Sequence, residues 1–242
     1  MKITYVYHSC YVVEFEEVVF VFDYYKGKLP TWDTQKKVLF FVSHKHQDHF
    51  SFEIFSFAEN YKDIIYILSN DIKFTDKFLI RHNINPCIKK KIIRIGKGTS
   101  KDLDIEGKCL RIETLRSTDQ GVAFLLKYND KSIYHAGDLN WWSWSGMTQQ
   151  ENDKMEIDYK QEINRLADKK IDIAFLVLDP RQEERYWWGM DYFLKTVEVG
   201  CVFPMHCWEK YSLIKQFQKD KGGEAYINKV QEIIDEGDNF EL

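Results

Sequence analysis

The chain has 242 residues, of which 44% are hydrophobic and 30% are charged, and its formal net charge is −4 at pH 7. This composition is typical of a globular protein with a sizeable core, and it lacks the basic excess with which proteins follow a nucleic-acid backbone. The N-terminus contains no signal-peptide core, and the longest apolar runs, such as 173–178, are too short to span a membrane. The five cysteines are odd in number and form no CxxC pair, so we expect a reduced, cytoplasmic protein.

The first half of the chain is predicted to be rich in strands. Alternating or β-branched apolar segments predict an antiparallel meander at 2–7, 11–15 and 18–22. A continuous apolar run at 38–42 is typical of a buried strand. Beyond it, the pattern predicts helices at 52–60 and 72–81, on either side of a strand at 64–68.

The second half repeats this order of strands followed by helices. Strands are predicted between 92 and 135, most clearly at 122–128 and 132–135. The elements expected after them are a helix at 156–169, a strand at 173–178, a helix near 190–199, a strand at 201–205, and helices at 211–217 and 226–234. Two comparable halves of this kind favour sheets covered by helices on their outer side.

Several side chains of metal-binding type follow directly after the strand predicted at 38–42. His44 and His46 lie two residues apart, so their imidazoles point the same way in an extended segment. Asp48 and His49 follow as the chain turns, and they can approach the same point from another side. Imidazole and carboxylate groups are ligands of zinc and similar divalent ions, so the segment predicts a metal site in preference to a chance cluster of polar loop residues. A serine-based triad is disfavoured because the sequence contains no GxSxG elbow.

The segment SHKHQDH at 43–49 resembles the HxHxDH signature of the metallo-β-lactamase superfamily. Three further matches follow in the order of that family: an aspartate that ends an early strand, a Gly-Asp turn after a later strand, and a histidine beyond a strand near the C-terminus. They correspond to Asp23, Asp138 and His206. The resemblance implies an α+β fold, a four-layer αββα sandwich formed by a single domain over residues 1–242.

The resemblance also implies a set of metal ligands. His44 and His46 would hold one ion, a second ion would be held by Asp48, His49 and His206, and Asp138 would bridge the two. Zinc is the expected metal, as one or two ions, with manganese and iron as alternatives.

Catalysis would follow from the same resemblance. A hydroxide between two such ions is a strong nucleophile, because the metal lowers the pKa of bound water to about 7. Asp48 is the expected catalytic residue, which would orient this hydroxide and handle its proton. Asp23 would hold a ligand histidine in one tautomer, and an ordinary aspartate of a surface turn is the alternative.

One element of the family pattern is missing from this sequence. The family supplies a third histidine to the first metal from a loop before the Gly-Asp strand, and we expect it here at Ser117 or Thr118. Asp119 could replace it as a ligand, whereas His135 is predicted to support the site or line its pocket. Three hypotheses follow: two metals with a weaker first site, one metal, or a protein that holds metal with little chemistry.

The surroundings of the predicted ligands are aromatic. Four tryptophans follow Asp138 or His206 closely in the chain, at Trp141, Trp142, Trp144 and Trp208. They predict an apolar wall around a substrate, or alternatively part of a large core. His8 resembles a histidine of the lactonase-like branch of the family, where it would contact substrate, and a structural histidine is the alternative. Arg181 is expected to form an ordinary ion pair, or to hold an anionic group.

The predicted function is metal-dependent hydrolysis of a small-molecule substrate: an ester, lactone, amide or phosphoester. A metal-dependent nuclease or phosphodiesterase is a second hypothesis. The acidic balance of the chain counts against it, because nucleic acid is not an expected partner of an acidic protein. A catalytically weak metal-binding or ligand-sensing protein is a third, because of the missing histidine. No membrane partner is expected, and the sequence predicts no oligomeric state.

Overall fold

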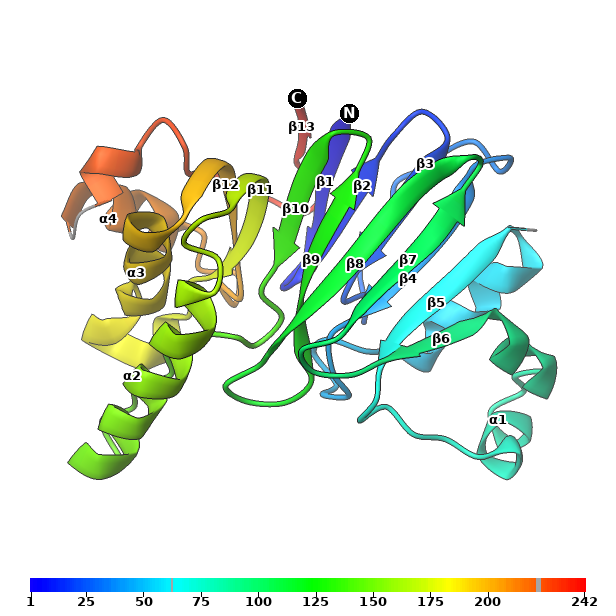
Figure 1. Cartoon of the computed structure of the whole chain (residues 1–242), viewed down its shortest axis with the longest axis horizontal. Coiled ribbons are helices and arrows are strands. Elements are labelled where there is room, and N and C mark those ends of the chain that lie inside the picture. Colours follow the sequence, from blue (N-terminus) through cyan, green and yellow to red (C-terminus); the bar gives the residue numbers. More distant parts are fainter. Residues whose placement is uncertain (62, 221–222) are drawn as a thin grey trace. The chain divides into compact units, whose positions relative to one another are not determined.

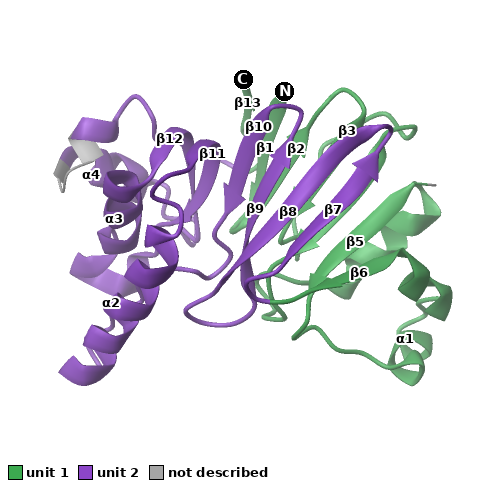
Figure 2. Ribbon diagram, viewed as in Figure 1, with its two compact units in different colours: residues 1–96, 236–242 green, residues 97–235 purple. Residues whose placement is uncertain are grey.

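The computed structural model describes residues 1–61, 63–220 and 223–242. The chain forms two compact units, which Figure 2 distinguishes by colour: unit 1 contains residues 1–96 and 236–242, and unit 2 contains residues 97–235. The prediction of a single domain over 1–242 stays a prediction. In the part of the chain that the structure describes, no helix is long and apolar enough to cross a membrane.

Unit 1 is built on a seven-stranded sheet in the order β13-β1-β2-β3-β4-β5-β6 (Figure 1). Its strands are β1 Lys2–Tyr7, β2 Cys10–Glu14, β3 Val18–Phe22, β4 Lys37–Val42, β5 Ile64–Ser69, β6 Ile92–Ile95 and β13 Asn239–Glu241. β1, β2 and β3 pair antiparallel, which confirms the predicted meander, whereas β3, β4, β5 and β6 pair parallel. The parallel pairing brings the C-terminal ends of β3 and β4 to the same edge of the sheet.

The helices of unit 1 are short. They are the 3₁₀ helices η1 Phe52–Glu59 and η2 Pro86–Lys91, and the α-helix α1 Asp76–Arg81. The helix predicted at 72–81 therefore begins late, because the Thr75 side chain accepts a hydrogen bond from the backbone N–H of Phe78 and caps the helix there. Ile54 and Leu79 of these helices pack into one apolar cluster with alternate residues of the central strands, such as Phe40.

Unit 2 is built on a six-stranded sheet in the order β12-β11-β10-β9-β8-β7. Its strands are β7 Ser100–Ile105, β8 Lys108–Arg116, β9 Val122–Tyr128, β10 Lys131–His135, β11 Lys170–Val177 and β12 Glu198–Met205. Its helices are α2 Gln149–Asn164, η3 Pro180–Arg185, α3 Trp188–Thr196, α4 Ser212–Asp220 and η4 Gly223–Tyr226. The ring of Tyr134 in β10 stacks on Phe193 of α3 at 5.1 Å between centroids, which joins this helix to the sheet. Sheets and helices in both units confirm the predicted α+β class.

Three predicted helices of unit 2 differ from the structure. α2 begins before the predicted residue 156, because Thr148 and Glu151 form a reciprocal capping box at its start. α3 ends at Thr196, before the strand β12, so 198–199 are not helical. The helix predicted at 226–234 is wrong: Val230 forms a bridge with Val202 of β12, and the backbone N–H of Gln231 bonds to the Val202 carbonyl. Pairing with the edge of the sheet competes successfully with helix formation in this segment.

Strand ends position the candidate site residues in both units. In unit 1, Asp23 follows β3 and the 43–49 segment follows the neighbouring parallel strand β4. In unit 2, β10, β11 and β12 run parallel, and Asp138, Asp179 and His206 follow their C-terminal ends. Side chains beyond the carboxyl ends of parallel strands meet at one edge of a sheet, which is where α/β proteins place their ligands.

Candidate metal centre

The loop after β4 brings the three predicted histidines of unit 1 into contact. The ring centroids of His44 and His46 lie 4.5 Å apart, and those of His44 and His49 lie 4.2 Å apart. His44 and His49 are fully buried, whereas His46 is only partly buried. The turn is closed by backbone hydrogen bonds from His49 and Phe50 to the carbonyl of His46. The rings of His44 and His46 are nearly perpendicular and those of His44 and His49 are tilted by 43°, and imidazoles grouped in this way can direct ring nitrogens toward an ion.

A buried carboxylate orients one of these histidines. Asp23 has no exposed surface, and its Oδ2 lies 2.8 Å from His49 Nδ1. The same carboxylate accepts hydrogen bonds from the Ser43 backbone N–H at 2.7 Å and from the Ser43 hydroxyl at 2.6 Å. Asp23 therefore contacts His49, one of the predicted ligands, and it is buried, so the surface-turn alternative is wrong.

These bonds determine which nitrogen of each ring carries the proton. The single hydroxyl proton of Ser43 is donated to Asp23, so Ser43 Oγ can only accept from His44 Nδ1, which lies 2.9 Å away. His49 Nδ1 donates to Asp23 in the same way. In both rings, Nε2 is then the atom that carries the lone pair, which is the form a metal ligand requires.

The donors of unit 1 fall into two groups. His44 and His46 each present a ligand atom within 4.8 Å of the other, and a second group with the same spacing contains His8, Asp48 and His49. This division matches the two ion positions that the sequence predicts for His44 and His46 and for Asp48 and His49. His8 is an additional donor, because its Nε2 lies 3.5 Å from Asp48 Oδ2 and its ring centroid 5.7 Å from that of His49.

The position of His8 depends on the turn between β1 and β2. Its φ is 55°, an uncommon conformation for a residue with a side chain, and Tyr5 Oη accepts a hydrogen bond from its backbone N–H at 2.9 Å. The side chain is almost completely buried. The sequence predicts a substrate-contacting or structural role for His8 and does not include it among the metal ligands.

Unit 2 supplies a carboxylate and a histidine that are themselves in contact. His206 Nε2 lies 3.2 Å from Asp138 Oδ1, and both side chains are buried. On the other side of the ring, Nδ1 of His206 lies 2.9 Å from Asp179 Oδ2. The backbone of His206 has a φ of 67°, so the chain turns sharply after β12 to direct this ring. The unit therefore repeats the carboxylate–histidine arrangement of Asp23 and His49.

Asp179 is held in its charged form. Burial by itself would raise the pKa of this carboxyl, but hydrogen bonds from His206 and Arg181 outweigh burial and lower its pKa to about 2. The guanidinium of Arg181 contributes three bonds of 2.6–3.0 Å. Arg181 thus forms the ordinary ion pair that the sequence favoured, and its partner fixes His206.

The turn that carries Asp138 is braced by neighbouring side chains. The backbone N–H of Gly137, whose φ is 52°, donates to His135 Nδ1 at 3.1 Å. Trp142 Nε1 donates to the Asp138 carbonyl at 2.9 Å. His135 is fully buried and supports the turn, in agreement with its predicted role.

The segment that lacks the expected histidine also stabilises the loop that follows Asp138. Thr118 Oγ1 donates to the Asn140 carbonyl at 2.7 Å and accepts from the Asn140 backbone N–H at 3.1 Å. Ser117 is buried, and its hydroxyl accepts from the backbone N–H of Asp119, whose side chain is exposed. Ser117 and Thr118 therefore stabilise the loop with their hydroxyl groups.

Three of the four tryptophans lie around His206. Trp142 is buried with its ring centroid 5.6 Å from that of His206, and Trp208 lies at 5.9 Å. Trp144 stacks on Trp142 with the ring planes 6° apart. These rings gather at the His206 loop, and their contact with a substrate stays a prediction. Trp141 does not belong to this group, because it packs against Trp188 of α3 and under the ammonium group of Lys160.

All five cysteines are free thiols. Cys207, beside His206, is buried, and burial raises the pKa of its thiol well above the usual range. A thiol that stays protonated is a poor ligand and a poor nucleophile, so Cys207 packs beside the site without joining its chemistry.

The donor set fits a divalent metal. Ligands of a tetrahedral ion at about 2.0–2.1 Å are separated from each other by about 3.3 Å. Two nitrogen–oxygen pairs of the described residues lie near this separation: His206 with Asp138 at 3.2 Å in unit 2, and His8 with Asp48 at 3.5 Å in unit 1. Imidazole and carboxylate ligands suit zinc, and also manganese and iron.

One family, described as "Beta-lactamase superfamily domain", matches residues 2–153. The matched segment includes the histidine-rich loop after β4 and the turn of Asp138, and it ends before His206. No curated protein matches the chain.

Solved structures with the same fold differ in their chemistry. Igni18, a metallo hydrolase from the archaeon Ignicoccus hospitalis, is 16% identical with a TM-score of 0.59, and the match covers 100% of this chain and 98% of that one. Isothiocyanate hydrolase from Delia radicum gut bacteria is 14% identical with a TM-score of 0.56, covering 100% and 99%. CmlA from Streptomyces venezuelae, a diiron β-hydroxylase, is 12% identical with a TM-score of 0.53, covering 85% and 44%. At these identities the likeness shows the fold alone.

Proposed function

Because this chain belongs to the metallo-β-lactamase superfamily and has the predicted α+β fold, we propose that it is a metal-dependent hydrolase of small esters, lactones, amides or phosphoesters. The observation that carries the proposal is the orientation of the histidines. In unit 1, His44 and His49 are held through Nδ1, and in unit 2, Asp179 holds His206 in the same way. Rings fixed at one nitrogen present the other to an ion at little entropic cost.

The proposed metal ligands are those of the family pattern. They are His44, His46, Asp48, His49, Asp138 and His206, with zinc as the proposed ion. His8 is added to this set, because it forms one donor group with Asp48 and His49 in unit 1. A bound divalent ion would supply an activated water near neutral pH and polarise the substrate carbonyl or phosphoryl group.

Asp48 is the proposed catalytic residue. Its side chain is 28% exposed, so it is accessible to a substrate water, whereas the other carboxylates of the site are buried. The carboxylate can accept a proton at Oδ1 or Oδ2. His8, whose Nε2 lies 3.5 Å from Oδ2, would bind the same ion as this carboxylate and so keep it beside the ion.

The aromatic residues of unit 2 are proposed to bind the body of the substrate. Trp142 is buried against the His206 ring, whereas Trp144, which stacks on Trp142, and the exposed Trp208 would present their ring faces to the substrate. The guanidinium carbon of Arg181 lies 4.6 Å from the ring centre of Trp208. The exposed edge of this guanidinium would attract an anionic substituent of the substrate.

Two alternatives remain distinct from this proposal. A nuclease or phosphodiesterase would use the same donors on a phosphodiester, and a binding or sensing protein would hold metal without turnover. CmlA, a diiron β-hydroxylase with a similar fold, is an example of chemistry other than hydrolysis on this fold.

The test combines metal analysis with a substrate panel. Elemental analysis of purified protein should find zinc, manganese or iron, and the metal-loaded protein should hydrolyse members of a panel of 4-nitrophenyl esters, lactones, amides and 4-nitrophenyl phosphate. Faster turnover of bis(4-nitrophenyl) phosphate would favour the phosphodiesterase, and metal without turnover would favour the binding protein. Asp138→Asn should strongly reduce turnover and preserve the fold, because an amide offers one acceptor oxygen where a bridging carboxylate offers two. The matched control is Asp191→Asn, a buried aspartate of α3 that pairs with Lys195.

A further inference from the structure

Unit 2 contains a cavity that the proposed hydrolysis does not use. It lies between η3 and the segment that leads into α4, and its volume is about 510 Å³. Cavities of roughly 300–1,000 Å³ hold small molecules. The proposed metal ligands and the tryptophans around His206 are not among the residues that line it.

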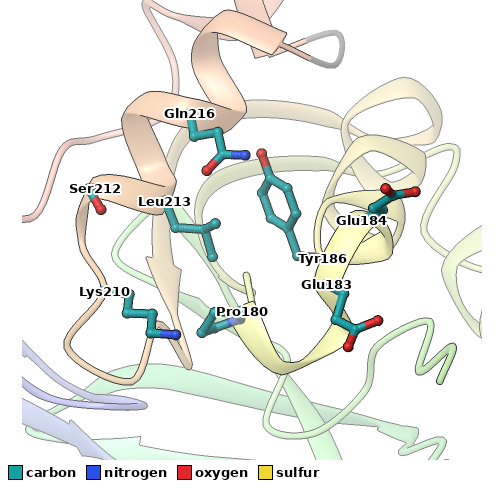
Figure 3. A pocket seen from close by; sticks show the side chains of 8 residues that line it. All are labelled: Pro180, Glu183, Glu184, Tyr186, Lys210, Ser212, Leu213 and Gln216. Carbon is teal, nitrogen blue, oxygen red and sulfur yellow. The ribbon is translucent and has the colours of Figure 1, made fainter. Parts of the chain in front are cut away.

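Charged groups of opposite sign stand on different sides of this cavity. Lys210 and Gln216 come from the segment of α4, whereas Glu183 and Glu184 come from η3, as Figure 3 shows. Among the residues that the structure describes, Lys210, Glu183 and Glu184 form no ion pair with one another or with other side chains. One cavity therefore offers a cation and two carboxylates that do not neutralise each other.

The surface between these charges is apolar. Leu213 and the ring of Tyr186 are buried at the centre of the view in Figure 3, and Pro180 lies between Lys210 and Glu183. Contact with such a surface favours an apolar group of a few carbon atoms, because it removes apolar area of both partners from water. The arrangement is thus a small apolar floor with a positive rim on one side and a negative rim on the other.

We propose that this cavity binds a small zwitterion of the amino-acid type. The carboxylate of the ligand pairs with the Lys210 ammonium, its ammonium group pairs with Glu183 and Glu184, and its apolar side chain packs on Leu213 and Tyr186. A purely anionic ligand would meet the two carboxylates, and a purely cationic ligand would meet Lys210. Only a molecule with both charges is attracted to both rims.

Two residues that line the cavity are close in the chain to His206 or to Asp179, which orients it. Pro180 directly follows Asp179, and the backbone N–H of Lys210 bonds to the carbonyl of Cys207 at 2.9 Å. A ligand here would order the two segments on either side without replacing a metal donor. Binding does not depend on the proposed hydrolysis, so either proposal can fail without the other.

The test is calorimetric titration of the purified full chain with the twenty common L-amino acids, followed by blocked analogues of one that binds. With L-leucine as the probe, L-leucinamide lacks the carboxylate and N-acetyl-L-leucine lacks the ammonium group. Each analogue should bind at least about fivefold more weakly, the factor expected for one partly exposed charge pair. Failure of all twenty amino acids to bind, or equal affinity for the blocked analogues, would overturn the proposal.

Two substitutions assign the charges to residues. Lys210→Met should weaken binding of L-leucine by about fivefold and leave binding of L-leucinamide unchanged, because that analogue has no carboxylate. Glu183→Gln should likewise weaken binding of L-leucine by about fivefold and leave binding of N-acetyl-L-leucine unchanged, because that analogue has no ammonium group. Both residues are exposed, so circular dichroism should show a folded protein in each case. Lys215→Met and Glu198→Gln are the controls, because neither residue lines the cavity and each forms an ion pair elsewhere, Lys215 with Glu232 and Glu198 with Lys170, so neither change should alter the affinity. Binding of L-leucine that is insensitive to both Lys210→Met and Glu183→Gln would place the ligand elsewhere and overturn the assignment.

Discussion

Asp179 Oδ2 lies 2.9 Å from His206 Nδ1 and also accepts a 2.6 Å bond from Arg181, so one buried carboxylate links the histidine to a surface arginine. Asp23 has the corresponding relationship to His49 in unit 1, with Ser43 in place of the arginine. Both carboxylates follow the end of a strand whose parallel neighbour carries the histidine. Each histidine is thereby fixed by the sheet before any ion binds.

The first prediction concerns this support. Asp179→Asn should lower the affinity for metal by about 10- to 100-fold, the usual effect of removing a carboxylate that orients a ligand histidine. Asparagine keeps the size of the side chain but loses the negative charge that favours the Nδ1–H tautomer. Competition with a chromophoric chelator measures the affinity, and Asp191→Asn serves as the control. Equal affinities for both variants and the wild type would contradict a role of Asp179 in metal binding.

The second prediction concerns acid stability. The pKa of Asp179 is lowered to about 2 in the folded chain, against an ordinary value of 3.8. A lowered carboxyl pKa contributes stability that is fully present above the unfolded value and is lost as the pH falls through the folded value. Asp179 should therefore contribute about 2 kcal/mol above pH 5, and this contribution should disappear between about pH 4 and 2.

Urea unfolding of metal-free wild type and Asp179→Asn from pH 2 to 6 measures this contribution. The difference in the free energy of unfolding between the two proteins should be largest at pH 6 and smallest at pH 2. The difference isolates Asp179 from the other carboxyls, which titrate in both proteins. A difference that is constant across this range would show that Asp179 does not titrate in the expected window.

The third prediction distinguishes ligation from support at His8. If His8 is a donor beside Asp48 and His49, His8→Ala should lower the metal content after dialysis as His49→Ala does. If it only positions Asp48, the metal content should persist while turnover falls. His82→Ala is the control, because His82 is exposed and its ring packs against Phe78 of α1. Elemental analysis together with the ester assay separates the two roles.

Local features could be predicted from the sequence where they depend on neighbouring residues. The predicted metal-binding segment after β4 could be recognised because its histidines and aspartate are close in the chain and follow an apolar strand. The strands of the meander could be predicted because the alternation of apolar residues is also a local pattern. Helix starts were less accurate, since they depend on capping bonds such as those of Thr148 and Thr75.

The features that escaped prediction depend on contacts distant in sequence. The role of Asp179 requires the parallel register of β11 and β12, which places it beside His206 across 27 positions of chain. His8 reaches Asp48 only because a positive φ turns it at the end of β1. The segment 226–234 pairs with β12 through Val230, and its apolar residues alone suggested a helix. In each case tertiary pairing decides what the local pattern leaves open.

The last prediction concerns the missing histidine. The family pattern places an imidazole at Ser117 or Thr118 to complete the site of His44 and His46, and without it we expect this ion to be lost first. Ser117 is buried and has little room for a larger side chain, so Thr118, which is only partly buried, is the better position. Thr118→His adds the imidazole but removes both hydrogen bonds to Asn140, at a cost of about 1–2 kcal/mol in stability.

The matched control is therefore Thr118→Ala, which loses the same bonds and adds no ligand. After dialysis against a mild chelator, wild type and Thr118→Ala should retain about one ion per chain, and Thr118→His should retain closer to two, because an added neutral imidazole supplies a full coordinate bond. Asp119→Ala should lower retention further if this carboxylate substitutes for the histidine. Equal retention by Thr118→His and Thr118→Ala, with two ions held by the wild type, would show that the first ion already has its third protein ligand.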